Sequence, residues 1–509
     1  MQLASFWQHW NLHRRTCDKT GKTIISVYPE DCPYPVWHKD AWVQHADPPG
    51  TEPDLNKPLF PQMWEFFSRS PIPHNVGVGN QNCEYTDDWW YSKNCYLSHS
   101  GLECEDVRYC YRIGWGRDSQ FCVYCFKSER CVDLINSQSC FDVRFGLDCR
   151  QCSDSAFLYD CRNCSHCMLC ANLRNKQYCF ENEQMTQEAY KQKIAEWDLR
   201  SRKTYSEAVD HFDRMLRERA WHRATLFEQC EECTGNYLIQ SRNAHNCYMG
   251  EKYHDCINLF RGHDVKDTLD SVCMFRVERA YDCVLVQDQC YDMRHCYNVM
   301  QSKSMEYCAH CLQCEHCFGC CGLVGKKYHL FNRACSQEEY ERRKADIIAA
   351  MERTGEYGRF FPSLFSAVIY EESLAQTHWP LTRERAAALG FRIRESDPQR
   401  VAGSLDSSEI PDRAEQVNAT LLKAVFWDEE ANRPFQIQQA DTDSSMRMNV
   451  PLLDGFYARR LRENFRRMPC AGDMRGVACG RCKAPTATSW PAEYDGRILC
   501  ENCYLKEVY

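Results

Sequence analysis

The sequence lacks the features that mark a secreted or membrane-bound chain. It contains no run of about 20 apolar residues, the length that a membrane-spanning helix requires. Its first residues, MQLASFWQHWNLHRR, contain no apolar stretch of signal-peptide length. These absences predict a cytoplasmic protein without a membrane partner.

Positive charge and catalytic motifs are also scarce. The formal net charge is -9 at pH 7, whereas a general nucleic-acid-binding surface is normally basic. The sequence contains no GxSxG or HExxH motif, and we find no pair of catalytic carboxylates and no small-molecule site. We therefore expect a protein that is not an enzyme.

Cysteine, in contrast, is abundant, with 37 residues in a chain of 509. In a cytoplasmic protein, so many cysteines indicate metal sites or buried thiols rather than disulfides. The odd number agrees, since complete pairing within one chain is impossible.

Most of these cysteines follow a period of nine residues in two arrays. One lattice of the first array holds Cys95, Cys104, Cys122, Cys131, Cys140, Cys149 and Cys167. The second array starts at Cys247, slips by two residues after Cys283 and resumes at Cys290. CSHCMLCANLRNKQYCF from Cys164 parallels CEHCFGCCGLVGKKYHL from Cys314, which indicates an internal duplication.

A short fixed period is typical of stacked units that share one continuous core. Nine residues fit half of an 18-residue β-solenoid coil, with cysteine as a small buried apolar residue. The predicted fold is mainly β with α segments. It contains two duplicated β-solenoid-like lobes of nine-residue repeats, helical connectors and a C-terminal zinc ribbon or treble clef.

Helices are expected between and after the arrays. EAYKQKIAEWDL and TYSEAVDHFDRMLRERAWHR have helical apolar spacing, and Thr186 can cap the first. Ser336 with Glu339 forms a capping box for a helix that ends near Gly355. Such helices would close the exposed ends of the lobes.

The strongest chemical signal is CGRC, 17 residues and then CENC at the end of the chain. Cys479, Cys482, Cys500 and Cys503 supply four thiolates, which suit one tetrahedral, structural Zn²⁺. TCDKTGKTIISVYPEDCPYPVWHKDAW looks like a degenerate copy with Cys17, Thr20, His38 and Ala41 at the ligand positions, so no zinc is expected there. VFWDEEANRPFQIQ, near 425–438, looks like a third copy without ligands.

These patterns predict seven segments. They are a degenerate zinc-ribbon-like module (1–80), lobe 1 (81–182), a helical connector (183–229), lobe 2 (230–332), a helical segment (333–395), a linker with a degenerate ribbon-like module (396–470) and the zinc-binding ribbon (471–509).

Two alternatives remain open at the level of sequence. The ends of the arrays could be buried structural thiols, could bind a metal ion or cluster, or could serve redox catalysis; the cysteines concerned are Cys161, Cys164, Cys167, Cys170, Cys308, Cys311, Cys314 and Cys317. The zinc ribbon and the segment YARRLRENFRRM could instead bind nucleic acid or the ribosome, through Arg459, Arg460, Arg466 and Arg467.

The arrays, the phrase LRNKQYCF (173–180) and the ending LCENCYLKEVY (499–509) resemble a family of uncharacterised cysteine-rich proteins of candidate-phylum, ultra-small bacteria. TCDKTGKTIISVY and GEYGRFFPSLFSAVIYEESLAQTHWPLT are similar to the same family. The resemblance implies zinc binding and no established activity. Together, the patterns favour a non-enzymatic zinc-binding scaffold or adaptor that binds a protein partner or itself.

Overall fold

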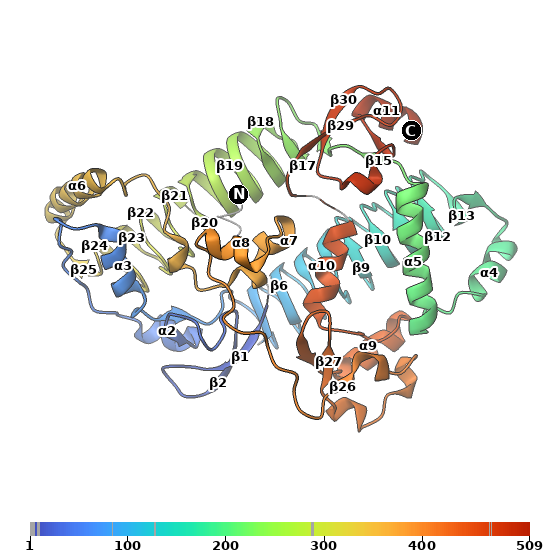
Figure 1. Ribbon diagram of the computed structural model, residues 1–509, viewed down its shortest axis with the longest axis horizontal. Helices are drawn as coiled ribbons and strands as arrows, with labels where there is room; N and C mark the ends of the chain where they lie inside the picture. The colour runs from blue at the N-terminus through green and yellow to red at the C-terminus, as the bar shows by residue number, and fades with distance from the viewer. Residues whose placement is uncertain are drawn as a thin grey trace. The chain divides into compact units, whose positions relative to one another are not determined.

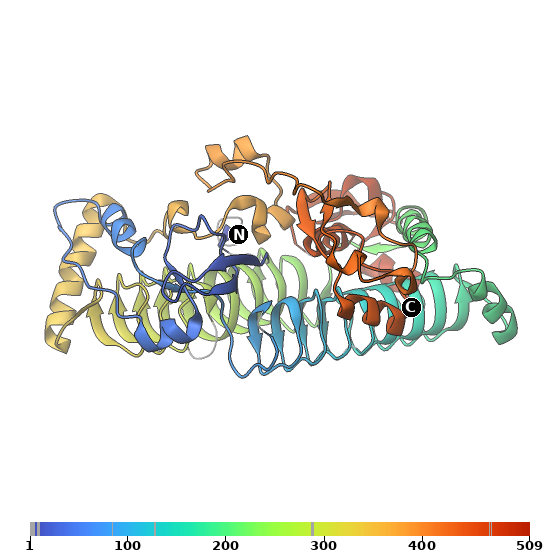
Figure 2. The same cartoon turned by 90° about the horizontal axis from the view of Figure 1, so that it is seen from below.

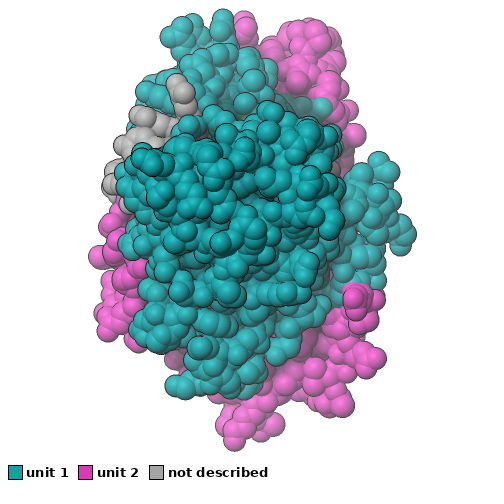
Figure 3. Space-filling view, turned by 90° about the vertical axis from the view of Figure 1, so that its left-hand side faces the viewer, with its two compact units in different colours: residues 1–76, 225–394, 470–474 teal, residues 77–224, 395–469, 475–509 magenta. Residues whose placement is uncertain are grey.

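The computed structural model describes residues 6–7, 11–83, 85–126, 129–286, 290–467, 469 and 471–509. It consists mainly of strands, with helices and several separate sheets (Figure 1). The chain divides into two compact units (Figure 3). Unit 1 comprises residues 1–76, 225–394 and 470–474, and unit 2 comprises residues 77–224, 395–469 and 475–509. Each unit thus combines one cysteine-rich array with parts of the chain that are distant in sequence. The division into seven segments stays a prediction.

The array of unit 2 is a ladder of parallel strands that follow one another in sequence order (Figure 2). Consecutive strands pair with a 12-residue offset, as Phe141 with Ser153 and Ser153 with Ser165. The strands are β5 (Tyr85–Trp90), β6 (Tyr96–Leu102), β7 (Tyr111–Gly114), β8 (Val123–Phe126), β9 (Val132–Ile135), β10 (Phe141–Leu147), β11 (Ser153–Tyr159), β12 (Ser165–Ala171), β13 (Gln177–Phe180) and the antiparallel β14 (Glu183–Gln184).

The array of unit 1 has the same construction. Glu315 pairs with Lys327, which is the same offset, and one extra residue is accommodated where Val277 pairs with Cys290. The strands are β16 (Phe227–Glu228), β17 (Gly235–Ile239), β18 (Arg242–His245), β19 (Cys247–Tyr281), β20 (Val284–Val286), β21 (Cys290–Arg294), β22 (Lys303–Glu306), β23 (Glu315–Phe318), β24 (Lys327–Leu330) and the antiparallel β25 (Arg333–Ala334).

A positive φ at every third residue gives the ladders their tight turns. Between Glu103 and Asp118, every third residue has a φ of 46° to 56°. Most L-residues avoid this region, which Asn and Asp tolerate best. The next residue in each triplet faces the interior, as Cys104 and Val107 do. Because four triplets make up the 12-residue offset, the expected 18-residue coil is wrong.

Cysteines in the interior contact the backbone as well as filling space. The Sγ atom of Cys131 lies 3.0 Å from the carbonyl oxygen of Glu129 and 3.7 Å from that of Cys140, nine residues on. The backbone N–H of Cys122 donates to Sγ of Cys110, in the preceding turn of the ladder, at 3.3 Å. Since buried backbone groups need partners, a small side chain with a donor and an acceptor suits these positions.

Helices follow the last strands of both ladders, as predicted from the sequence. Thr186 and Ser336 cap α4 (Gln187–Ala195) and α6 (Gln337–Thr354) by accepting a backbone N–H three residues on. Gly355, with a φ of +68°, ends α6. The starts of β13, β14 and α4 are spaced along the chain as are those of β24, β25 and α6, which agrees with the parallel endings of the arrays.

Helix α5 (Arg202–Glu218) lies across the ladder of unit 2 (Figure 1). It buries residues at helical spacing, including Tyr205 and Phe212. The Phe212 ring packs against those of Phe145 and Phe157, with centroids 5.3 and 5.9 Å away. Side chains on this helix therefore cover outward-facing aromatic residues of the ladder.

The remaining elements form small modules in each unit. Unit 1 has β1 (His13–Thr16), β2 (Thr23–Ser26), β3 (Val36–Trp37), α2 (Lys39–His45), α3 (Leu59–Phe67), β4 (Ile72–Pro73), η1 (Ser363–Phe365), η2 (Tyr370–Glu372), α7 (Leu374–His378) and α8 (Arg383–Ala388). Unit 2 has β15 (His222–Arg223), β26 (Leu405–Asp406), η3 (Ser407–Glu409), η4 (Ala414–Gln416), η5 (Leu421–Lys423), β27 (Phe426–Asp428), β28 (Arg433–Phe435), α9 (Gln439–Met448), α10 (Tyr457–Arg467), β29 (Arg475–Ala478), β30 (Pro485–Thr488), η6 (Ala492–Tyr494), β31 (Ile498–Leu499) and α11 (Glu501–Val508).

Candidate metal centre

Four cysteines in the last part of unit 2 bring their sulfur atoms together. The Sγ atoms of Cys479, Cys482, Cys500 and Cys503 all lie within 4.8 Å of one another. Those of Cys482 and Cys500 are 3.7 Å apart. Four sulfurs around a tetrahedral metal ion at about 2.3 Å are separated by about 3.8 Å. The quartet can therefore hold one metal ion with all four ligand positions filled.

A hairpin of β29 and β30 shapes the first pair of ligands. The backbone N–H of Cys479 donates to the carbonyl oxygen of Ala484 at 2.9 Å. Gly480 donates to the carbonyl oxygen of Ile498 at 2.8 Å. A Cβ atom at Gly480 would lie 2.2 Å from the carbonyl oxygen of Gly496, so this turn requires glycine.

The second pair of ligands lies at the start of α11. Cys500 is the N-cap residue of this helix, and Cys503 is in its first turn. The positive end of a helix dipole favours a thiolate over a thiol. The local fold therefore supplies two ligands from the hairpin and two from a helix N-terminus.

Hydrogen bonds prepare Cys479 for ionisation. Burial opposes the thiolate, but backbone N–H groups, including that of Cys500 at 3.4 Å, lower the pKa of Cys479 to about 6. The side chain of Cys503 shares a hydrogen bond with Cys482, which raises the pKa of Cys503 to about 12. A bound cation would replace such shared protons and hold all four sulfurs as thiolates.

The segment that carries the four cysteines (residues 475–509, the cysteine module) is attached to the ladder of unit 2 through Tyr504, the residue after Cys503. The Tyr504 hydroxyl donates to Asp160, and Arg174 donates to the same hydroxyl at 3.2 Å. Arg223 of β15 makes an ion pair with Glu501 of α11, at 2.7 Å between Nε and Oε2. No sequence pattern indicated these contacts, because they join segments far apart in the chain.

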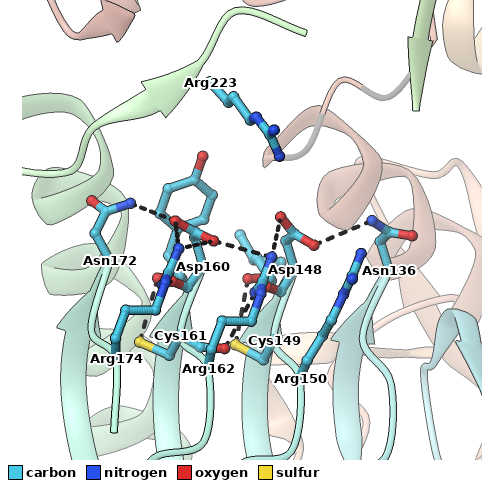
Figure 4. A network of polar contacts seen from close by, with 12 residues as sticks. Asn136, Asp148, Cys149, Arg150, Asp160, Cys161, Arg162, Asn172, Arg174 and Arg223 are labelled. Atoms are coloured by element: carbon cyan, nitrogen blue, oxygen red, sulfur yellow. Dashed lines mark hydrogen bonds and ion pairs between the residues drawn. The ribbon is translucent and has the colours of Figure 1, made fainter. Parts of the chain in front are cut away.

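Asp160 belongs to a row of acidic and amide side chains that faces a row of arginines (Figure 4). Both rows share the 12-residue spacing of the ladder: Asn136, Asp148, Asp160 and Asn172 in one, and Arg150, Arg162 and Arg174 in the other. Arg162 lies 3.2 Å from Asp148 and 3.1 Å from Asp160. Burial raises the pKa of the Asp148 carboxyl, although Arg162 opposes this shift. The module therefore attaches where ion pairs already order the ladder surface.

The cysteines at the array ends lie in the ladder interiors. All eight are buried, and each contacts the carbonyl oxygen two residues earlier at 3.2–3.5 Å. Among the described residues, Cys479 and its three partners are the only group of three or more ligands that converges within 4.8 Å. Metal binding at the array ends stays a prediction.

The arginines of α10 mostly contact carboxylates of unit 2. Arg459 pairs with Asp428 at 2.9 Å, Arg460 pairs with the buried Asp133, and Arg467 pairs with Asp213 at 2.8 Å. Arg466, in contrast, is exposed. The basic run is therefore largely part of the internal packing of unit 2, and nucleic-acid binding through it stays a prediction.

The elements of the N-terminal hairpin have the same spacing along the chain as those of the cysteine module, and its assignment as a degenerate copy stays a prediction. The elements β1, β2, β3 and α2 start at the same intervals along the chain as β29, β30, β31 and α11. Sγ of Cys17 accepts the backbone N–H groups of Thr20 at 3.4 Å and of His38 at 3.2 Å. The aligned positions carry Cys17, Thr20, His38 and Ala41, of which only the cysteine and the histidine have ligating side chains.

No family model matches the chain, and no curated protein is detectably similar to it. Within the described part of the chain, no helix combines the length and the apolar character that crossing a membrane requires.

Proposed function

We propose that this chain is a non-enzymatic scaffold in which two β-solenoid-like lobes present surfaces to a protein partner or to a second copy. One structural Zn²⁺ holds the terminal module in its fold. The closed set of four thiols carries this proposal, because a metal with four protein ligands has no position for substrate or water.

Two further observations support the proposal. Tyr504, Arg174 and Asp160 connect the cysteine module to the ladder, so metal binding would brace the lobe of unit 2. Every cysteine whose side chain the structure describes is a free thiol, which suits the reducing cytoplasm. The proposal also includes membership of the cysteine-rich family that the sequence resembles.

Elemental analysis of the purified protein tests the metal site. We expect about one zinc per chain in the wild type and almost none in Cys479→Ser. Cys335→Ser is the matched control, because Cys335 is a partly exposed thiol outside the quartet. Chelation should expose residues 475–509 to protease.

Three results would contradict the proposal. Absence of zinc from freshly purified wild type would exclude the brace. Iron with visible absorbance would favour a redox cluster instead. Reproducible turnover in broad hydrolase or redox screens, abolished by Cys479→Ser, would show that the site is catalytic.

A further inference from the structure

A second hairpin of unit 2, formed by β27 and β28, has the backbone of the cysteine module but carries no cysteine. In this hairpin Asp428 pairs with Arg433, and Asn432 has a φ of +52°. Asn432 lies four residues after Asp428. In the cysteine module, Lys483 has a φ of +63° and lies four residues after Cys479. Asp428 therefore occupies the position of Cys479.

The contacts of Asp428 reproduce those of the first metal ligand. The backbone N–H of Ala431, three residues on, donates to Asp428 at 2.9 Å, as that of Cys482 donates to Cys479. The N–H of Phe456, immediately before α10, donates to Asp428 at 2.7 Å. In the cysteine module the corresponding donor is the residue before α11. The four ligand positions are thus filled by Asp428, Ala431, Phe456 and Arg459.

An ion pair joins the first and fourth of these positions. Nε of Arg459 lies 2.9 Å from Oδ2 of Asp428, whose side chain is only 4% exposed. Glu463 also binds the Arg459 guanidinium, at 2.7 Å. A Cβ atom at Gly455 would lie 2.2 Å from Arg459 and 2.4 Å from Asp428, so glycine leaves the space that this pair occupies.

The residue after the fourth ligand position attaches both modules to the ladder. Arg460 follows Arg459 and pairs with the buried Asp133, and Asn464 donates to the same carboxylate at 2.9 Å. In the cysteine module, the residue after Cys503 contacts Asp160 in the same way. Arg460 and Tyr504 thus hold equivalent positions in their helices, and both bind the ladder of unit 2.

We propose that residues 425–467 form a metal-independent copy of the cysteine module, in which the Arg459 guanidinium serves as a built-in cation. The ladder of unit 2 then has two braces, one that requires a metal ion and one that does not. This proposal goes beyond the proposed function, since it holds whichever metal the four cysteines bind.

Converting the ion-pair module into a metal site tests the proposal. The quadruple variant Asp428→Cys, Ala431→Cys, Phe456→Cys and Arg459→Cys should bind one zinc per chain more than the wild type. The matched control carries the first three substitutions and keeps Arg459, and it should gain no zinc. A folded quadruple variant without additional zinc would overturn the proposal.

Hydrogen exchange provides a second test that does not depend on folding of the quadruple variant. Chelation of the wild type should leave the protection of residues 425–467 unchanged. Arg459→Met, with zinc present, should increase exchange there by at least tenfold, because a buried carboxylate loses its counter-charge. Loss of protection on chelation alone, or no effect of Arg459→Met, would overturn the proposal. Absence of zinc from the wild type would refute the proposed zinc brace and leave both readouts intact.

Discussion

At the scale of single residues, the chain shows why cysteine is so frequent in its ladders. The thiol fills little space, donates weakly to a carbonyl group and accepts from a backbone N–H. Serine at interior positions makes the same contacts: Ser137 Oγ accepts the N–H of Cys149 at 3.1 Å. Most of the cysteines thus have a packing role that needs no metal.

Removing one such thiol should therefore lower the free energy of unfolding more than replacing it by a hydroxyl group does. Cys110 is fully buried, and its Sγ accepts the N–H of Cys122. We expect Cys110→Ala to lower the free energy of unfolding by about 2 kcal/mol, because it leaves that N–H without an acceptor and opens a small cavity. Cys110→Ser keeps the acceptor and should cost less than about 1 kcal/mol. Urea unfolding followed by circular dichroism measures both; equal losses would contradict this account.

At the scale of elements, the 12-residue offset determines which outward side chains are neighbours. The amide of Asn163 donates to that of Asn175 at 2.8 Å across two adjacent turns of the ladder, and both residues are exposed. Residues nine apart recur in the sequence pattern, but they lie on different sides of the ladder. Their outward side chains are therefore not neighbours.

Cross-linking measures this offset directly. Cα atoms opposite each other in neighbouring strands are about 5 Å apart, within the range of a disulfide. We expect Asn163→Cys with Asn175→Cys to form a disulfide under mild oxidation, detected by peptide mass spectrometry. Asp154→Cys with Asn163→Cys, nine residues apart, is the matched control and should not. The reverse pattern would show that the nine-residue period is the spatial one.

At the scale of the whole molecule, each unit buries histidines in their neutral form. Burial lowers the pKa of His222 in unit 2 to about 4, and those of His74 and His378 in unit 1 to about 3. His222 bridges the ladder and its neighbours, since its ring nitrogens contact the Tyr159 hydroxyl at 2.9 Å and the Leu216 carbonyl oxygen at 2.8 Å. Acid should therefore destabilise both units.

The sign of this pH dependence follows from the lowered pKa values. Below about pH 6.5 these histidines bind protons in the unfolded chain but stay neutral in the folded chain. The free energy of unfolding is therefore highest above about pH 6.5 and falls as the pH falls toward 4. For His222 the loss reaches about 3 kcal/mol at most. Urea midpoints between pH 7.5 and 5 measure it, and His222→Gln should reduce the slope. An unchanged slope in this variant would contradict a neutral buried His222.

More of the candidate site than of the fold could be predicted from the sequence. The spacing of Cys479, Cys482, Cys500 and Cys503 was sufficient, because two CxxC turns joined by a short hairpin bring their own ligands together. The caps at Thr186, Ser336 and Gly355 were equally local and were confirmed. The sequence indicated a third copy only near 425–438 and without ligands, and it gave no sign that the copy extends to α10, since the chain between Asp428 and Phe456 is longer than that between Cys479 and Cys500.

Features that depend on neighbouring residues could thus be read from the amino-acid order alone: the four converging cysteines that could hold a metal ion, the helix caps and the burial of most array cysteines. The length of the ladder turn emerged only from the folded chain, because inward residues recur every third position and both nine and 12 are multiples of three. The same holds for the contacts of Asp160, Asp133 and Asp428. Each of these carboxylates meets a partner from a distant segment, and such pairing depends on how the folded chain packs rather than on any periodicity.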